Sequence, residues 1–234
     1  MIRHLKRTFN DLVQLFYPEV CLGCRTSLYE GEKLLCLTCF SQLPVAYKVL
    51  EADDKVKDLF YGRANIEHAS SLLFYEKIGM VKQLIHHLKY DGHEEVSSYL
   101  GKQMANAMYS DPAFQKLTHV VPVPVHKKRL KKRGYNQVNG FGMEIASKFE
   151  AKFMPDLLIK TRNTINQAKL GQVKRSDESS SPYELNLNLE LPENSHILIV
   201  DDVITTGTTL SMCIKELQKI KGTTIYVATM AISV

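Results

Sequence analysis

The chain has 234 residues, of which 44% are hydrophobic and 24% are charged, and its formal net charge is +5. This length can build one substantial core, or one core together with a small additional module. No apolar run approaches the length of a membrane span, so we expect no membrane insertion. The modest positive charge permits an anionic partner without requiring one.

Residues 1–17 alternate basic and apolar side chains. They lack the continuous apolar core and the small-residue cleavage site of a secretory signal. We therefore expect an amphipathic helix that packs on the protein, and a cytoplasmic location.

Four of the five cysteines form two Cys-x-x-Cys pairs separated by eleven residues, namely Cys21, Cys24, Cys36 and Cys39. Each pair can place two thiolates on one metal ion, and the two pairs complete a tetrahedron. In a reducing compartment this spacing is typical of structural zinc, with redox-active cysteines as the alternative. Four thiolates leave no ligand position for water, so we do not expect a catalytic zinc. The fifth, Cys213, shares a helical face with apolar residues and is expected in the core.

The composition divides the chain into three parts. Residues 1–45 are expected to form an N-terminal arm with the four-cysteine zinc module. Residues 46–68 mix acidic residues and lysines with little periodicity and are interpreted as a linker. From residue 69 to residue 234, predicted strands and helices alternate, which indicates an α/β domain whose mostly parallel sheet is covered by helices on both faces.

The apolar spacing predicts these elements in chain order: a strand at 69–75, helices at 78–88 and 96–108, a short strand at 119–124, a helix at 138–149, strands at 157–159, 183–189 and 197–200, a helix at 210–220 and a strand at 224–230. In such folds, ligands bind beyond the carboxyl ends of the strands. The loops after Val123 and Val200 meet that description and carry chemically active side chains.

The loop after Val200 combines acids with a hydroxyl-rich turn. Asp201 and Asp202 follow the buried strand, and the turn that opens the next helix consists of Thr205, Thr206, Gly207, Thr208 and Thr209. Backbone N–H groups, hydroxyls and the helix dipole make such a turn an anion site. The carboxylates can accept hydrogen bonds from sugar hydroxyls and help to hold Mg²⁺. The stretch predicts a site for a phosphorylated ribose; the alternative is an ordinary strand–turn–helix in which the acids cap the helix.

The loop after Val123 runs into a strongly basic segment. Six of the eight residues from His126 to Arg133 are cations, namely Lys127, Lys128, Arg129, Lys131, Lys132 and Arg133. Three interpretations stay open: a solvated helix face, a pyrophosphate clamp, or a nucleic-acid groove in which Tyr135 stacks on bases. The last two are compatible, because a groove of Lys and Arg serves either polyanion.

Residues 162–181 are polar and show no clear periodicity. Such a segment within a compact domain is typical of a functional lid or of a disordered connection. Arg162, Gln167 and Arg175 are the candidate lid residues, because an arginine presents a bidentate fork to phosphate oxygens. Closure over a leaving pyrophosphate would exclude water.

The stretch 197–210 resembles the phosphoribosyl pyrophosphate (PRPP) signature of type I phosphoribosyltransferases. The resemblance extends along nearly the whole chain, because CxxC…CxxC, KQLI…LKYDG, VPVPVH with its basic run, RGYNQ, TRNT and DDVITTG together look like the ComF family of competence-associated proteins. It implies a type I phosphoribosyltransferase fold with an N-terminal zinc module. It also implies a role in the uptake or processing of transforming single-stranded DNA, with helicase and recombination-mediator partners.

Carried over by motif, the resemblance makes Asp201 and Asp202 the catalytic pair that holds the ribose hydroxyls and Mg²⁺. It makes the Thr-rich turn the cradle of the 5′-phosphate, and it places Lys127, Lys128 and Arg129 near pyrophosphate. One position departs from the purine-salvage branch, in which an acid typically stands where this chain has Thr205. A threonine cannot act as a base, which counts against 6-oxopurine chemistry.

Three functions remain open at this stage. The first is a PRPP-binding module that handles single-stranded DNA, and Thr205 favours it. The second is an active transferase that attaches phosphoribose to an unidentified nucleophile. The third is a PRPP-sensing regulator.

Overall fold

The computed structural model describes residues 18–48, 50–162 and 181–233. The N-terminal segment expected as an amphipathic helix lies outside the described residues, as do Gln167 and Arg175. The helices are α2 (Leu37–Ser41), α3 (Leu50–Asp58), α4 (Met80–Tyr90), α5 (Glu95–Tyr109), the 3₁₀ turn η1 (Pro112–Phe114), α6 (Lys127–Arg133), α7 (Asn139–Lys148) and α8 (Thr208–Leu217). The strands are β1 (His68–Tyr75), β2 (His119–Pro122), β3 (Lys152–Phe153), β4 (Leu158–Lys160), β5 (Tyr183–Leu185), β6 (His196–Ile204) and β7 (Thr224–Ser233).

The main sheet has five strands in the order β1-β7-β6-β2-β3, and every neighbouring pair is parallel. This confirms the α/β class and the parallel sheet predicted from the alternation of strands and helices. The central strand β6 is buried on both sides, since Ile197, Leu198, Ile199 and Val200 are all fully covered. A strand of continuous apolar residues is what a sheet with two covered faces requires.

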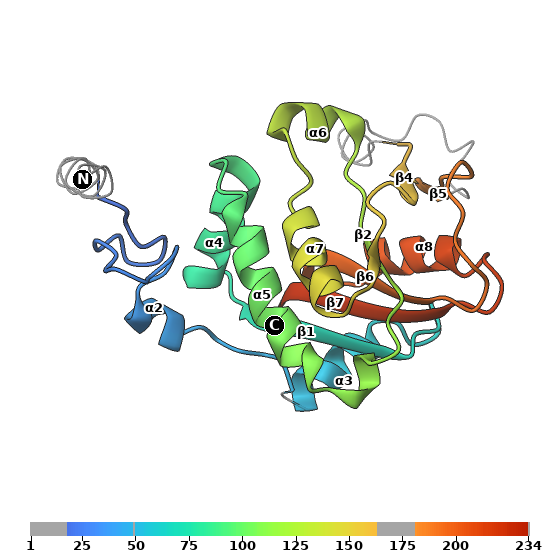
Figure 1. Ribbon diagram of the computed structural model, residues 1–234, viewed down its shortest axis with the longest axis horizontal. Helices are drawn as coiled ribbons and strands as arrows, with labels where there is room; N and C mark the ends of the chain where they lie inside the picture. The colour runs from blue at the N-terminus through green and yellow to red at the C-terminus, as the bar shows by residue number, and fades with distance from the viewer. Residues whose placement is uncertain (1–17, 49, 163–180, 234) are drawn as a thin grey trace, which may run out of the picture.

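Helices cover both faces of the sheet (Figure 1). Leu198 and Val200 point to the face that packs against α4, α5 and α7, whereas Ile197 and Ile199 point to the face that packs against α3 and α8. Successive side chains of a strand alternate between faces, so a single apolar run supplies both cores.

Two of the predicted strands lie outside the main sheet. The strands predicted at 157–159 and 183–189 correspond to β4 and β5, which form an antiparallel pair of their own. The main-sheet strand that follows α7 is β3 instead, a two-residue strand paired with β2. Two residues carry too little periodicity to be recognised in a sequence.

The segment expected as a linker contains a nine-residue helix, α3. Ala52, Val56 and Phe60 of this segment are buried in the core on the α8 side of the sheet. We expected a linker with, at most, a single helical turn in this segment. The structure has a longer helix there, because packing of its apolar side chains against a sheet face stabilises it. The division of the chain into three parts stays a prediction.

The N-terminal cysteine module packs on the opposite face. Cys21, Cys36 and Cys39 belong to the same buried cluster as the inner side chains of α4 and α5. Phe40 contacts the ring of Tyr99 of α5 edge to face, with ring centroids 6.5 Å apart. Within the described ranges, no helix combines the length and apolarity needed to cross a membrane.

Candidate functional site

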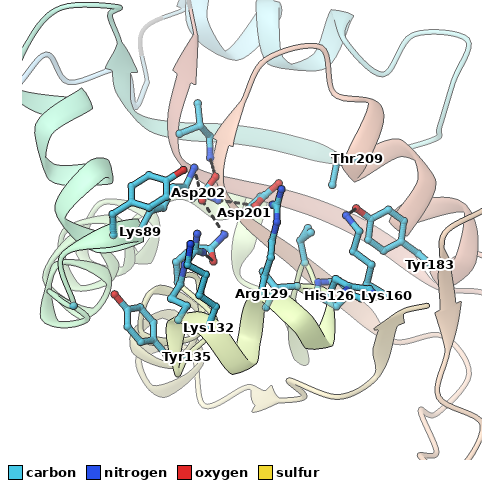
Figure 2. A pocket seen from close by; sticks show the side chains of 18 residues that line it. Lys89, His126, Arg129, Lys132, Tyr135, Lys160, Tyr183, Asp201, Asp202 and Thr209 are labelled. Atoms are coloured by element: carbon cyan, nitrogen blue, oxygen red, sulfur yellow. Dashed lines mark hydrogen bonds and ion pairs between the residues drawn. The ribbon is translucent and has the colours of Figure 1, made fainter. Parts of the chain in front are cut away.

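A cleft of about 650 Å³ lies at the carboxyl ends of β2 and β6. Its walls come from the end of α4, the β2–α6 loop, α6, the β4–β5 pair, the end of β6 and the start of α8 (Figure 2). The charged and aromatic lining residues are Lys89, Tyr90, His126, Arg129, Lys132, Arg133, Tyr135, Lys160, Tyr183, Asp201 and Asp202. A pocket with two carboxylates at its base and cations around it suits a ligand that carries both hydroxyl groups and anionic groups.

The two acids lie in the last part of β6, beyond the point where β2 pairs with that strand. Strand β2 ends with Pro122 opposite Val200, while β6 continues to Ile204 alongside β7. The open edge exposes the acids to the cleft. The N–H of Asp202 donates to Oδ1 of Asp201 at 2.8 Å. Burial raises the pKa of Asp201 to about 7, and the neighbouring charge of Asp202 adds to the rise.

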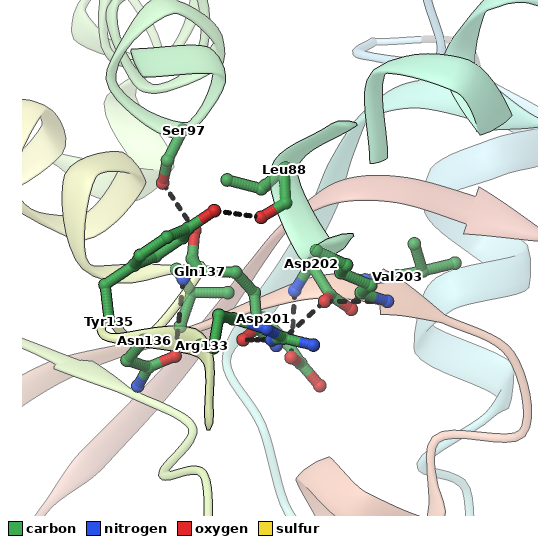
Figure 3. Close-up of polar contacts among 11 residues, drawn as sticks. Leu88, Ser97, Arg133, Tyr135, Asn136, Gln137, Asp201, Asp202 and Val203 are labelled. Atoms are coloured by element: carbon green, nitrogen blue, oxygen red, sulfur yellow. Dashed lines mark hydrogen bonds and ion pairs between the residues drawn. The ribbon is translucent and has the colours of Figure 1, made fainter. Parts of the chain in front are cut away.

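Asp202 is held by two side chains that our sequence analysis did not assign. Nζ of Lys89 lies 2.9 Å from Oδ2 of Asp202, and Nε2 of Gln137 donates to the same oxygen at 2.9 Å (Figure 3). Lys89 belongs to the LKYDG stretch at the end of α4, which the motif comparison noted without giving it a role. The ion pair joins α4 to the end of β6, and it distinguishes the two acids: both line the cleft, and Lys89 pairs with Asp202.

Gln137 is itself fixed by its neighbours. Nη1 of Arg133 donates to Oε1 of Gln137, and Oγ of Ser97 donates to the Gln137 backbone carbonyl at 2.6 Å. Gln137 is buried. Buried polar groups need such partners, so the amide is oriented before any ligand arrives.

The two residues that precede Gln137, Tyr135 and Asn136, make hydrogen bonds that connect parts of the fold. The hydroxyl of Tyr135 donates to the backbone carbonyl of Leu88, and Nδ2 of Asn136 donates to the carbonyl of Val123 at 3.0 Å. The segment therefore ties α4 and the β2–α6 loop together (Figure 3). Tyr135, which we expected to be available for stacking, has its hydroxyl committed to α4.

The basic run forms α6, which begins after His126 and ends at Gly134 with φ of 88°. Three of its six cations line the cleft, namely Arg129, Lys132 and Arg133. They are three and four residues apart and so share one face of the helix. The other three, Lys127, Lys128 and Lys131, are exposed and lie outside the cleft lining. The expectation that Lys127 and Lys128 accompany Arg129 near pyrophosphate stays a prediction, although only Arg129 of the three lines the cleft.

The Thr-rich turn leads into α8 through Gly207, whose φ of 70° favours glycine. A side chain at Gly207 would also approach Cβ of Leu59 to 3.2 Å. Nη1 of Arg63 donates to the carbonyl of Thr206 at 2.7 Å. The segment after α3, expected as part of a linker, thus supports this turn. Of the five turn residues, Thr209 lines the cleft.

The wall opposite α4 is the β4–β5 pair. Nζ of Lys160 donates to the hydroxyl of Tyr183 at 2.9 Å. Burial lowers the pKa of Lys160, and the nearby charge of Arg129 contributes. Sequence reasoning did not identify either residue, because their contact depends on the antiparallel pairing. Arg162, a candidate lid residue, lies outside the cleft lining.

The four cysteines converge at a separate place. Their Sγ atoms all lie within 4.8 Å of one another, and those of Cys24 and Cys36 are 3.7 Å apart. A zinc ion with Zn–S bonds of about 2.3 Å in a tetrahedron requires S–S distances of about 3.8 Å. The side chain of Thr26 lowers the pKa of Cys24 to about 6, which favours the thiolate. The donor set therefore fits a structural zinc ion.

Comparison with known proteins identifies a matching domain family and several relatives. Residues 140–231 match the phosphoribosyl transferase domain. The chain is 22% identical over 223 residues to Competence protein F of Haemophilus influenzae, a match that spans 88% of this chain and 93% of that protein. It is 23% identical over 198 residues to Competence protein ComFC of Bacillus subtilis, covering 82% of this chain and 75% of that protein.

These relatives, the matched domain and the four-cysteine cluster support a ComF-type phosphoribosyltransferase-like protein. A third relative, DNA utilization protein YhgH of Escherichia coli, is 27% identical over 131 residues, which span 55% of this chain and 56% of that protein. In this ComF-type protein the matched domain begins within α7 and includes β6, α8 and β7. The cysteine module and α6 lie before the matched segment.

Proposed function

We propose that the cleft binds PRPP together with Mg²⁺. The observation that carries the proposal is the meeting of Asp201 with the inner cations of α6, Arg129, Lys132 and Arg133, in one cleft. PRPP presents a ribose diol, a 5′-phosphate and a pyrophosphate. Carboxylates suit the diol and a Mg²⁺ ion, and guanidinium and ammonium groups suit the pyrophosphate.

Each part of PRPP has a candidate partner. Asp201 and Asp202 hold the ribose hydroxyls and contribute to the Mg²⁺ site. The first N–H groups of α8 have no acceptor within the helix, and with the hydroxyls of the Thr-rich turn they bind the 5′-phosphate. The inner cations of α6 bind pyrophosphate.

Phosphoribosyl transfer is the second candidate function, favoured by the meeting of the two acids and the inner cations of α6 in one cleft. In this reaction a nucleophile bonds to C1 of the ribose, the C1–O bond to pyrophosphate breaks, and the nucleophile's proton passes to solvent. Release of pyrophosphate from PRPP in the presence of an acceptor is the measurement that distinguishes transfer from binding.

We further propose that the protein handles single-stranded DNA during natural transformation. The names of its relatives, Competence protein F and DNA utilization protein YhgH, support this role. The exposed lysines of α6 outside the cleft lining, Lys127, Lys128 and Lys131, supply charge for a phosphate backbone. The helicase and recombination-mediator partners implied by the family resemblance belong to this proposal.

Calorimetric titration tests the PRPP site. PRPP added with Mg²⁺ should give saturable heat, and pyrophosphate should compete for the same site. Ribose 5-phosphate should bind more weakly because it lacks the pyrophosphate, which is the group we propose binds to the inner cations of α6. Absence of saturable heat with PRPP and Mg²⁺ would refute the site.

The two faces of α6 should separate PRPP binding from DNA binding. Replacing the outer lysines Lys127, Lys128 and Lys131 with glutamine should reduce the salt dependence of single-strand binding by about two in the log–log slope, since each lost cation removes about 0.7. The matched triple change at Arg129, Lys132 and Arg133 should weaken PRPP binding. The assignment fails if the outer set changes PRPP affinity as much as the inner set does.

A further inference from the structure

Tyr90 has a large aromatic side chain that is not packed in the hydrophobic core. It is the last residue of α4, and its side chain is 70% exposed. The buried face of the helix is formed by Val81, Leu84, Ile85 and Leu88. Tyr90 nevertheless lines the cleft beside Lys89, whose ammonium group holds Asp202. An exposed aromatic ring that lines a charged cleft is available to a bound ligand.

The ring of Tyr90 has two neighbours that suit a flat, anionic ligand. Cζ of Arg133 is 6.0 Å from its centroid, and the ring of His86 is 4.9 Å away. Arg133 is held in place because it also donates to Gln137. An exposed cation–π contact contributes only about 0.5–1 kcal/mol, so it orients the ring without covering it.

Neither of two other tyrosines offers the same combination. Tyr135 lines the cleft, but it is only part-exposed and its hydroxyl is bonded to α4. Tyr109 is 53% exposed and has Nζ of Lys148 at 4.5 Å from its ring, yet it lies outside the cleft lining. Tyr90 unites exposure, an adjacent cation and a position at the cleft. Tyr109 therefore provides a matched comparison.

We propose that Tyr90, with His86 and Arg133, is a stacking platform for a nucleobase of single-stranded DNA at the mouth of the cleft. This inference rests on the DNA role proposed above. Proteins that bind single strands combine a basic track for the phosphates with aromatic rings for the bases. Here the outer lysines of α6 provide the track and Tyr90 provides the ring. Bases in a duplex are already stacked on one another, so the platform selects single strands.

A comparison between a normal and an abasic oligonucleotide tests the platform. Both strands carry the same number of phosphates, but only the first has bases to stack. By fluorescence anisotropy, the wild-type protein should bind the oligothymidine about ten-fold more tightly than the abasic strand. Tyr90→Ala should remove that preference, Tyr90→Phe should retain it, and Tyr109→Ala should leave it unchanged.

The absence of tryptophan from the chain offers a second readout that does not depend on affinity. Tyr90→Trp introduces a single tryptophan, whose fluorescence should be quenched when a base stacks on it. Oligothymidine should quench this residue, whereas the abasic strand and a duplex should not. Tyr109→Trp should show no quenching with any of them.

The outcomes separate the inference from the function on which it rests. If the wild-type protein binds no oligonucleotide, the DNA role and the platform both fail. If it binds, but Tyr90→Ala keeps the preference for bases, the platform alone is refuted. Titration of the Tyr90→Trp variant with thymidine monophosphate completes the experiment. If this nucleotide quenches the tryptophan as strongly as the oligonucleotide does at equal base concentration, the platform binds a free nucleotide and the assignment to DNA is overturned.

Discussion

Replacing Asp201 with asparagine is expected to weaken PRPP binding by about 100-fold or more, because hydrogen bonds to a charged group are each worth about 1.5–3 kcal/mol. The same change should stabilise the ligand-free protein near neutral pH. The carboxylate of Asp201 is confined beside Asp202, and its pKa is raised from 3.8 to about 7. Asparagine keeps the oxygen that accepts the Asp202 N–H and removes the unfavourable charge.

The direction of the pH dependence follows from this raised pKa. Between about pH 4 and pH 7, the folded protein retains a proton on Asp201 that the unfolded chain releases, so this group's contribution to stability falls as pH rises. The full shift corresponds to at most about 4 kcal/mol, and partial exposure reduces it to about 1–3 kcal/mol. The neighbouring charges that shift the pKa of this carboxyl are Asp202, which raises it, and Lys89 and Lys160, which lower it.

Thermal unfolding at two pH values tests this expectation. Asp201→Asn should raise the midpoint at about pH 8 by several degrees and by less at about pH 5.5, since about 1 kcal/mol moves it by about 2–4 °C. Asp202→Asn should lower the midpoint, because Lys89 would lose its carboxylate. Asp156→Asn, at an exposed acid, should change little. Equal effects of the two cleft variants would contradict the distinct roles given to the acids.

Removal of a zinc ion held by the four cysteines is expected to destabilise the α/β domain as well as the N-terminal module. Three of the four cysteines are buried in the cluster that includes the inner faces of α4 and α5. A side chain at Gly23 would lie 2.8 Å from Sδ of Met80, which shows how closely the first Cys-x-x-Cys turn packs against the start of α4. Structural zinc contributes about 10–16 kcal/mol in isolated finger peptides, and a zinc ion held by this cluster would also support the packing of α4 and α5 on the sheet.

A chelator should therefore lower the unfolding midpoint by at least about 10 °C, and added zinc should restore it. Cys36→Ser should reproduce the loss and reduce the metal content below one zinc per chain. Cys213→Ala is the comparison, because this cysteine lies on α8 and is buried in the core on the other face of the sheet, and the change should leave the metal content unchanged. A protein without bound metal that is indifferent to chelation would disprove the zinc assignment.

Several features of this protein are determined by the sequence alone. The spacing of the four cysteines predicted a cluster, and their Sγ atoms do converge. The alternation of apolar elements predicted the parallel sheet. The DDVITTG stretch predicted acids near the end of a strand and a Thr-rich turn into a helix, and the structure has the acids in the last part of β6 and the turn leading into α8. These features share a physical reason: each is set by groups within a few residues, or by a repeated local period, so the spacing along the chain already contains the geometry.

The contacts between distant segments were decided by the tertiary structure. Lys89 meets Asp202 only because α4 ends beside β6, and the basic run divides into inner and outer cations only because one face of α6 turns to the cleft. The docking of α4 likewise commits the hydroxyl of Tyr135 and leaves Tyr90 exposed. Such pairings depend on how packed elements orient their faces, and the local pattern of residues does not encode that orientation.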